Sequence, residues 1–447
     1  MIMKKSQKLV ILVSIFMISI LSFIPSWHYI TPLFARAKVS PEGPAINDTH
    51  LTTQLIASGL KAPSAMTFIG QDDILVTEKN TGNVVRIVNG VISQQPLLHV
   101  EVAKKDERGL LGIAISRNTE TGKRYVFLYY TEAQRNDVQG VTPDPLGNRV
   151  YRYELVNDKL VNPKLLLDLP ALPGPRHNAG KMAIGPDNNL YVSIGDVDAS
   201  FLDIDTETKA QNNEDGPAPD GRAGILRITE DGKPVGNGIL GNTPILNLYY
   251  AYGIKNSFGF DFDPVTGKMW DTENGPTFGD EINLVEPGFN SGWLKVQGIW
   301  KTDIDPAEKL ERGEIATNES LDLVDFGGKG KYSPPEFTWS NTVAPTALRF
   351  FSSDKFGEKY NNNIFVGDIK YGNIYHFKLN KDRTGFIVNG SLADKVASGE
   401  DGTEQIEFAH GFGGIADLEL GPDGYLYVLV FDNENGSIFK ISPVSSS

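Results

Sequence analysis

The stretch Gly185-Pro-Asp-Asn-Asn-Leu-Tyr-Val-Ser-Ile-Gly-Asp196 contains a polar turn followed by a short run of β-favouring residues. A near copy, Gly421-Pro-Asp-Gly-Tyr-Leu-Tyr-Val-Leu-Val430, lies close to the end of the chain. A second apolar run follows each of them, Gly224-Ile-Leu-Arg-Ile228 after the first and Gly436-Ser-Ile-Phe-Lys-Ile441 after the second. The order turn, strand, turn, strand predicts a β-hairpin in both places.

Four more segments of the chain have the same hairpin layout. They are residues 73–79 with 82–87, 124–130 with 148–153, 267–273 with 280–285, and 363–368 with 372–377. Six degenerate copies, at intervals of roughly 50 to 95 residues, predict one repeat architecture rather than several unrelated domains.

The repeat predicts an all-β fold, a six-bladed β-propeller over residues 51–442 with a short tail at 443–447. A single hairpin cannot bury its apolar face, whereas a ring of four-stranded sheets buries each face against a neighbour. Two β-sandwiches in tandem would not explain six copies of one hairpin. In a propeller we expect functional residues in the loops around the central channel.

The composition excludes several classes of site. The 447 residues include 42 Lys and Arg, 56 Asp and Glu and no Cys, for a net charge of −14. Without cysteine there is no disulfide scaffold, no thiol nucleophile, no iron–sulfur cluster and no Cys-based zinc site. The acidic balance and the lack of a basic block make nucleic acid a poor partner, whereas carboxylate-rich loops suit hard cations.

The N-terminal segment predicts export. Three lysines precede an apolar run, Leu9–Ile24, as in a signal peptide or an uncleaved anchor. We expect residues 1–37 to be either a signal cleaved near Ala35-Arg36-Ala37 or a membrane anchor through residues 9–30, with a linker at 38–50. The protein is then extracytoplasmic, secreted or held at the outer face of the cell membrane.

Three departures from the repeat carry candidate chemistry. His177 stands in a Gly- and Pro-rich loop, where an imidazole can take a proton near neutral pH or simply form surface hydrogen bonds. The turn from Asp271 to Glu281 is dense in carboxylates and suits Ca²⁺ or solvent. The acidic stretch Asp196–Asp220 predicts a mobile, solvated loop. No G-x-S-x-G elbow or Walker motif appears, which disfavours a P-loop type of nucleotide site.

Six short motifs occur in a fixed order along the chain. They are Arg108-Gly-Leu-Leu-Gly-Ile-Ala114, Arg176-His-Asn-Ala-Gly-Lys-Met-Ala-Ile-Gly-Pro-Asp187, Gly253-Ile-Lys-Asn-Ser-Phe-Gly259, Glu273-Asn-Gly-Pro276, Asp280-Glu-Ile-Asn-Leu284 and Asn290-Ser-Gly-Trp293. Together they resemble the soluble glucose/sorbosone (aldose sugar) dehydrogenases, six-bladed propellers that depend on pyrroloquinoline quinone (PQQ). The resemblance covers about residues 50–442 and implies oxidation of an aldose C1 hydroxyl to a lactone, with electrons passed to an external acceptor.

The resemblance also implies roles for individual residues. It makes His177 the base that removes the hydroxyl proton while hydride passes from C1 to PQQ. The other implied contacts are Lys255, Asn256, Thr342 and Lys370 for the cofactor, Glu107 and Arg176 for the substrate, the carbonyls of Gly275 and Pro276 for the calcium that holds the quinone, and Asp280 and Glu281 for a second, structural calcium.

Some positions depart from the family pattern. Lys255 stands in place of an arginine, Gly414 and Ala416 stand where two arginines are frequent, and Glu107 stands in place of a glutamine. Because PQQ carries three carboxylates, fewer guanidinium partners predict weaker binding. Two alternatives to a dehydrogenase remain open: a non-catalytic propeller that binds sugar or protein, and a calcium-dependent hydrolase of the lactonase type.

Overall fold

The computed structural model describes residues 37–116, 122–134, 144–198, 206–304, 310–317, 321–398 and 402–444. The chain divides into two compact units, Met1–Ala35 and Arg36–Ser447. The expected signal or anchor segment lies outside the described residues, apart from Ala37. None of the helices in the described part is long and apolar enough to cross a membrane.

The described residues form six main sheets in chain order. The first contains β3 (Pro63–Gly70), β4 (Asp73–Glu78), β5 (Asn83–Val88), β6 (Val91–Ile92) and β7 (Leu98–His99). The second contains β8 (Leu110–Ile115), β9 (Tyr125–Ala133), β10 (Pro145–Val156) and β11 (Lys159–Leu169). The third contains β12 (Met182–Ile184), β13 (Leu190–Ile194), β14 (Gly224–Ile228), β15 (Tyr249–Tyr252), β19 (Phe289–Asn290) and β23 (Lys331–Tyr332).

The second half of the chain supplies three more main sheets. The fourth contains β16 (Gly259–Phe262), β17 (Met269–Glu273), β18 (Asp280–Val285), β24 (Phe337–Trp339) and β28 (Val396–Ala397). The fifth contains β25 (Pro345–Phe351), β26 (Asn363–Asp368), β27 (Ile374–Phe377), β29 (Glu407–His410) and β1 (Ala45–Ile46). The sixth contains β30 (Ile415–Leu420), β31 (Leu426–Val430), β32 (Gly436–Pro443) and β2 (Leu51–Leu60).

A small additional sheet and three short 3₁₀ helices complete the described elements. The sheet contains β20 (Val296–Gln297), β21 (Trp300–Ile304) and β22 (Leu310–Ile315). The 3₁₀ helices are η3 (Lys209–Gln211), η4 (Leu246–Leu248) and η6 (Gly390–Leu392). These elements lie outside the six main sheets.

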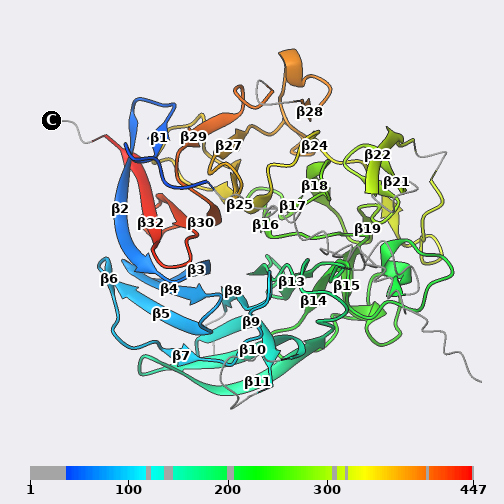
Figure 1. Ribbon diagram of the computed structural model, residues 1–447, viewed down its shortest axis with the longest axis horizontal. Helices are drawn as coiled ribbons and strands as arrows, with labels where there is room; N and C mark the ends of the chain where they lie inside the picture. Colours follow the sequence, from blue (N-terminus) through cyan, green and yellow to red (C-terminus); the bar gives the residue numbers. More distant parts are fainter. Residues whose placement is uncertain are drawn as a thin grey trace, which may run out of the picture. The chain divides into compact units, whose positions relative to one another are not determined.

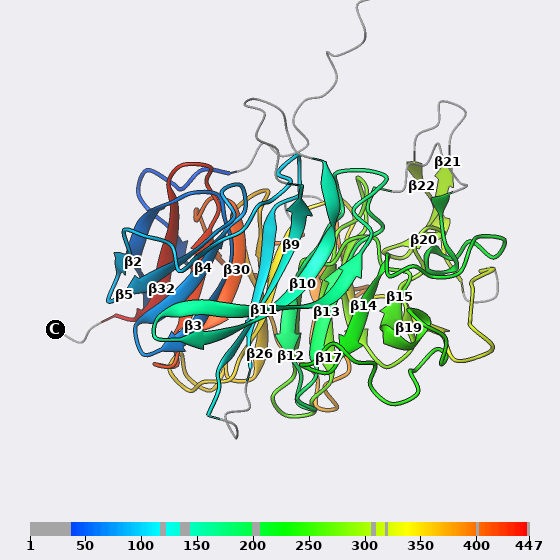
Figure 2. The same ribbon diagram turned by 90° about the horizontal axis from the view of Figure 1, so that it is seen from below.

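The first strands of the six sheets close a ring. β3 contacts β8, β8 contacts β12, and the contacts continue through β16, β25 and β30 back to β3. The ring is closed by two segments that are far apart in the sequence, because β2 pairs with β32, the last strand. Within residues 37–444 the sheets surround a common centre (Figure 1), and in the side view their strands run from one face of the ring to the other (Figure 2). This is the β-propeller arrangement that the repeat predicts.

Each of the six predicted hairpins is a pair of neighbouring antiparallel strands. The pairs are β4 with β5, β9 with β10, β13 with β14, β17 with β18, β26 with β27, and β31 with β32. The repeat is visible in the sequence because these central strands are rich in β-branched, aromatic and other apolar residues and are bounded by polar turns. β13, for example, is buried at all five positions, since it has a sheet on either side.

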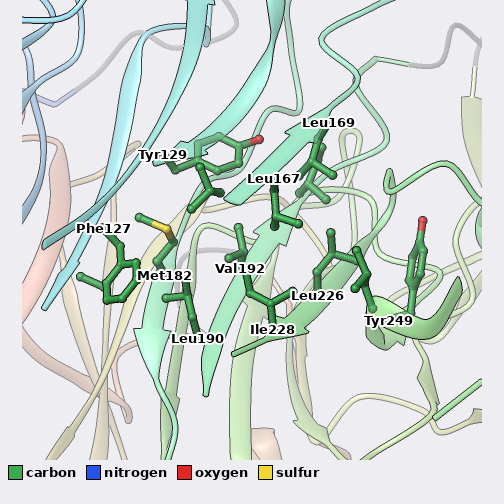
Figure 3. Close-up of a cluster of buried hydrophobic side chains, with 14 of the residues drawn as sticks. Phe127, Tyr129, Leu167, Leu169, Met182, Leu190, Val192, Leu226, Ile228 and Tyr249 are labelled. Carbon is green, nitrogen blue, oxygen red and sulfur yellow. The ribbon is translucent and has the colours of Figure 1, made fainter. Parts of the chain in front are cut away.

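The space between adjacent sheets is filled by large apolar side chains. Between the second and third sheets, Tyr129 and Leu167 pack with Met182 and Val192 in one buried cluster (Figure 3). Burying apolar area against a neighbour stabilises each sheet by roughly 25 cal/mol per Å². No sheet can obtain this stabilisation alone, so the ring folds as a unit.

The segment expected to be a linker, residues 38–50, carries paired backbone. β1 pairs antiparallel with β29, and Val39 forms a bridge with Phe412. The chain therefore lies against the fifth sheet before it enters β2.

Replacing Leu226 by Ala tests the packing between sheets. Leu226 is fully buried on β14 within the cluster of Figure 3, so L226A should lower the free energy of unfolding by about 2–5 kcal/mol. Leu165 on β11 is 44% exposed, and L165A should change it by less than about 0.5 kcal/mol. Urea unfolding measures both variants; equal losses would contradict the assigned packing.

Candidate active site

The candidate residues lie at one face of the ring because of their positions along the strands. Second strands run antiparallel to first strands, so the start of one and the end of the other share a face. Six of the residues precede the first strand of a sheet: Glu107, Arg176, His177, Lys255, Asn256 and Thr342. Four others follow the second strand of a sheet: Asp196, Gly275, Pro276 and Lys370. Neighbouring loops bond directly, as in the 3.3 Å bond from the Glu107 N–H to the Pro175 carbonyl and the 2.9 Å bond from the Asn274 N–H to the Asn256 carbonyl.

His177 is held from two sides. Its Nδ1 lies 2.6 Å from Oδ1 of Asp196, and its backbone N–H donates to Oε2 of Glu107 at 2.6 Å. The backbone of His177 is left-handed, with φ of 54°, a conformation that the surrounding contacts must maintain. The side chain of His177 is 14% exposed, so the ring is fixed but reachable.

Asp196 is a buried carboxylate that is hydrogen-bonded to the imidazole of His177. Burial acts to raise the pKa of Asp196, but the charge and hydrogen bond of His177, helped by Lys255 and Trp293, bring that pKa below its ordinary value. An ionised carboxylate only accepts hydrogen bonds, so Nδ1 of His177 must donate. When the imidazole is neutral with its proton on Nδ1, the Nε2 atom carries the lone pair.

Lys255 occupies the other side of the imidazole. Its Nζ lies 3.0 Å from Nε2 of His177 and donates to that lone pair. The ammonium also lies 5.7 Å from the ring centre of Trp293, within cation–π range. A side chain at Gly195 would come within 2.6 Å of the carbonyls of His177 and Lys255, so glycine there allows the two loops to approach.

Glu107 joins His177 to Asn256. Oε2 of Glu107 accepts from the His177 N–H and, at 3.4 Å, from Nδ2 of Asn256. Oδ1 of Asn256 is buried with no hydrogen-bond partner, which leaves an acceptor for a bound molecule. Arg176 instead donates to Oδ2 of Asp106 at 3.0 Å, and this ion pair opposes the effect of burial, so the pKa of Arg176 is raised.

Asp280 ties the loop after β17 to the loop before β25. Its Oδ1 accepts from the Gly275 N–H at 2.7 Å, and its Oδ2 accepts from the N–H groups of Val343 and Ala344, each at 2.6 Å. Burial raises the pKa of Asp280 to about 6 in spite of these donors. In the loop after β26, Nζ of Lys370 donates to the Thr342 carbonyl at 2.7 Å.

The fourth sheet buries three carboxylic acids, Asp271, Glu273 and Glu281. Glu273 and Glu281 stand opposite each other on β17 and β18, and Ser291 Oγ lies 2.7 and 2.8 Å from them. The single hydroxyl hydrogen of Ser291 can be donated to only one of the two carboxylates, so the other needs a proton or a cation. Burial accordingly raises the pKa of Glu273 to about 7 and that of Glu281 and Asp271 well above the usual value.

Several oxygens of these acids have no partner. Both carboxylate oxygens of Asp271 and Oε2 of Glu281 are buried without a hydrogen bond. Buried oxygens of this kind are unfavourable unless a proton or a cation satisfies them. Within the described ranges, however, no three His, Asp or Glu side chains are placed to hold one metal ion, so backbone carbonyls would have to complete any cation site.

Comparison with known proteins identifies the family. The sequence profile described as Glucose / Sorbosone dehydrogenase matches residues 60–440. The chain belongs to the glucose/sorbosone dehydrogenase family. It is homologous to oxidoreductases that act on sugars.

Two curated relatives and one solved structure illustrate the similarity. The chain is 25% identical over 422 residues to the aldose sugar dehydrogenase YliI of Escherichia coli, covering 93% of this chain and 98% of that protein. It is 28% identical over 360 residues to quinoprotein glucose dehydrogenase B of Acinetobacter calcoaceticus, covering 76% and 70%. The PQQ-bound aldose sugar dehydrogenase of Streptomyces coelicolor has the same fold, with a TM-score of 0.60 and 19% identity over 89% of this chain and all of that one.

The structure corrects one expectation for this member of the glucose/sorbosone dehydrogenase family. The stretch Asp196–Asp220 is only partly a solvated loop in its described parts. Asp196 contacts His177, and Thr208 caps η3 while Gln211 and Asn212 are buried, whereas Glu214 and Asp215 are exposed as expected. Residues 199–205 lie outside the described ranges. Acidic composition suggested solvent exposure, but hydrogen bonds from buried donors compensate the polar groups.

Two residues of the hydrogen-bond network around the candidate base were missed by the sequence reasoning. Asp196 was counted with the acidic stretch, although its place directly after a predicted strand is a signal that could have found it. Trp293 belonged to a family motif but had no role assigned. In the structure its Nε1 donates to Oδ2 of Asp196 at 2.8 Å.

The buried carboxyl groups predict a stability that falls as pH rises. Burial raises the pKa of Glu273, Asp368 and Glu419 to about 7, above the values near 4 of an unfolded chain. Between these values the folded state binds more protons, so protonation stabilises it and this stability is lost as pH passes through about 7. With a chelator present, the urea midpoint should be higher at pH 6.5 than at pH 8.5. A midpoint that rises with pH would contradict these environments.

Proposed function

We propose that this protein is a quinoprotein sugar dehydrogenase that oxidises the C1 hydroxyl of an aldose to a lactone, with PQQ as cofactor. The observation that carries the proposal is the array formed by Asp196, His177 and Lys255 at one face of the ring. Family membership supports it, and two relatives are named for aldose and glucose oxidation. A sugar substrate and an external electron acceptor are then the partners.

The residues present fit an anionic quinone. Lys255 and Lys370 supply ammonium groups for carboxylates, and the unpartnered Oδ1 of Asn256 supplies a buried polar contact. Thr342 is linked to Lys370 by its carbonyl. When bound, the quinone supplies the two-electron chemistry, which no side chain of this protein can perform.

Calcium fits the same face of the ring. The carbonyls of Gly275 and Pro276 are offered by a loop so tight that a side chain at Gly275 would meet the Phe278 carbonyl. The orphaned oxygens of Asp271 and Glu281 are hard ligands of the kind that Ca²⁺ takes. Asp280 has its oxygens engaged by backbone donors, so its part is to hold the loop.

The side chains support a division of the proton chemistry. Nε2 of His177 would accept the proton of the C1 hydroxyl when Lys255 no longer donates to it, and the bound quinone would supply the acceptor for the hydride of the same carbon. Asp196 stabilises the imidazolium that forms and keeps Nδ1 protonated throughout. The carboxylate of Glu107 accepts a hydrogen bond from the backbone N–H of His177 and so holds the backbone of the base in place.

One of the two positions where the family often has arginine, Gly414, is hydrogen-bonded to the start of the described residues. The Gly414 N–H donates to the Ala37 carbonyl at 3.1 Å, and the Ala37 N–H donates to the Lys370 carbonyl at 3.1 Å. A side chain at Gly413 would lie 2.9 Å from the Val39 nitrogen. With no guanidinium at Gly414 or Ala416, the two lysines carry the anion binding, and we expect PQQ to bind less tightly than in arginine-containing relatives.

We also propose that the protein works outside the cytoplasm, secreted or anchored through residues 9–30. The basic and apolar pattern of the N-terminal segment supports this. Cell fractionation tests it, and recovery of the full-length chain in the cytoplasm alone would overturn it.

Reconstitution is the direct test of the dehydrogenase. Purified protein is loaded with PQQ and Ca²⁺, desalted and assayed for dye reduction with a panel of aldoses. We expect retained quinone absorbance and sugar-dependent turnover that yields a lactone. Absence of both would overturn the proposal, with sugar binding but no turnover pointing to the non-catalytic alternative and lactone hydrolysis pointing to the hydrolase.

The variant H177A should lose about 10²- to 10⁴-fold in kcat, because it removes the group that takes the proton. PQQ absorbance after desalting should be retained, since the lysines remain. H410Q is the control, because His410 is exposed and pairs with Glu407 on β29. A near-normal kcat for H177A would show that another group is the base.

A further inference from the structure

Trp293 lies directly behind the dyad of Asp196 and His177. Its indole is 1% exposed, and its Nε1 donates to Oδ2 of Asp196 at 2.8 Å. The other oxygen of Asp196, Oδ1, accepts from His177 at 2.6 Å and from the Asp198 N–H at 3.0 Å. Because both oxygens have donors on opposite sides, the carboxylate cannot rotate without losing a hydrogen bond.

The same indole also touches the second partner of His177. Its ring centre lies 5.7 Å from Nζ of Lys255. Trp293 therefore contacts the groups on both sides of the imidazole, although no contact between Trp293 and the imidazole itself is needed for this. A change in the indole position would alter the two neighbours of the base together.

The backbone around Trp293 is held by three hydrogen bonds. The Trp293 N–H donates to the Gly253 carbonyl at 2.9 Å, and the Leu294 N–H donates to the Gln211 carbonyl at 2.9 Å. Nδ2 of Asn212 donates to the Trp293 carbonyl at 2.7 Å. Gln211 and Asn212, in the buried part of the acidic stretch, thus hold the backbone that carries the indole.

We propose that Trp293 is a positioning residue for proton abstraction. By donating to Oδ2 it fixes the carboxylate of Asp196 in the orientation that keeps Nδ1 of His177 protonated and Nε2 directed toward the substrate. The role rests on the proposed dehydrogenase function, but the hydrogen-bond geometry does not. Trp293 does not itself exchange a proton with the sugar.

A purely structural role for the indole makes a different prediction, and the chain offers a matched control. Trp270 is as deeply buried as Trp293, yet its Nε1 has no hydrogen-bond partner. Exchange of either tryptophan for phenylalanine removes the same volume. Only W293F removes a donated hydrogen bond.

The experiment compares W293F and W270F in protein loaded with PQQ and Ca²⁺. W293F should lower kcat at least tenfold and change the sugar KM less than threefold, whereas W270F should keep kcat within about twofold of wild type. In the unloaded protein, the downfield proton NMR signal of the His177 Nδ1–H should weaken or shift in W293F and stay unchanged in W270F.

A kcat for W293F within twofold of wild type, or an unchanged Nδ1–H signal, would overturn the proposal. If wild-type protein shows no turnover, the proposed function fails while the NMR comparison still tests the positioning role. Should W293F fail to fold, replacement of Trp293 by 3-benzothienylalanine keeps the shape of the indole and exchanges its N–H for sulfur. This variant should show the same losses, and wild-type behaviour would overturn the proposal.

Discussion

The short hydrogen bond between Asp196 and His177 is the interaction on which the site depends. A carboxylate that is 1% exposed needs donors to remain ionised. These donors come from three separate parts of the chain: the loop before β12, the turn after β13 and the segment after β19. All three segments adjoin strands of the third sheet, and together they supply donors to one buried charge.

The architecture could be predicted from the sequence because it depends on local pattern. Each central hairpin consists of short apolar runs bounded by Gly, Asp and Asn, and the structure confirms all six pairs. The face of the ring that carries His177, Lys255 and Lys370 follows from the strand order. The outer strands could not be predicted in the same way. β19 and β23 join the third sheet by parallel pairing from distant segments, and no local sequence pattern indicates this pairing.

The partners of the base could not be predicted with the same ease. Asp196 and Trp293 are separated by 97 residues in the sequence, and the acidic composition around Asp196 suggested a loop in solvent. The family resemblance implies that Asp280 binds calcium, and the structure adds that backbone N–H groups from two loops donate to its oxygens. In each case the environment is set by groups that are distant in the sequence, which composition and spacing do not encode.

The exchange of Asp196 for Asn tests the account most directly. Asn is the same size but has one acceptor oxygen and an amide donor, so it cannot accept from both His177 and Trp293 or stabilise an imidazolium. With PQQ and Ca²⁺ bound, D196N should lose about 10²- to 10⁴-fold in kcat while its quinone absorbance is retained. A D196N enzyme with kcat close to wild type would contradict the claim that this buried carboxylate orients the base.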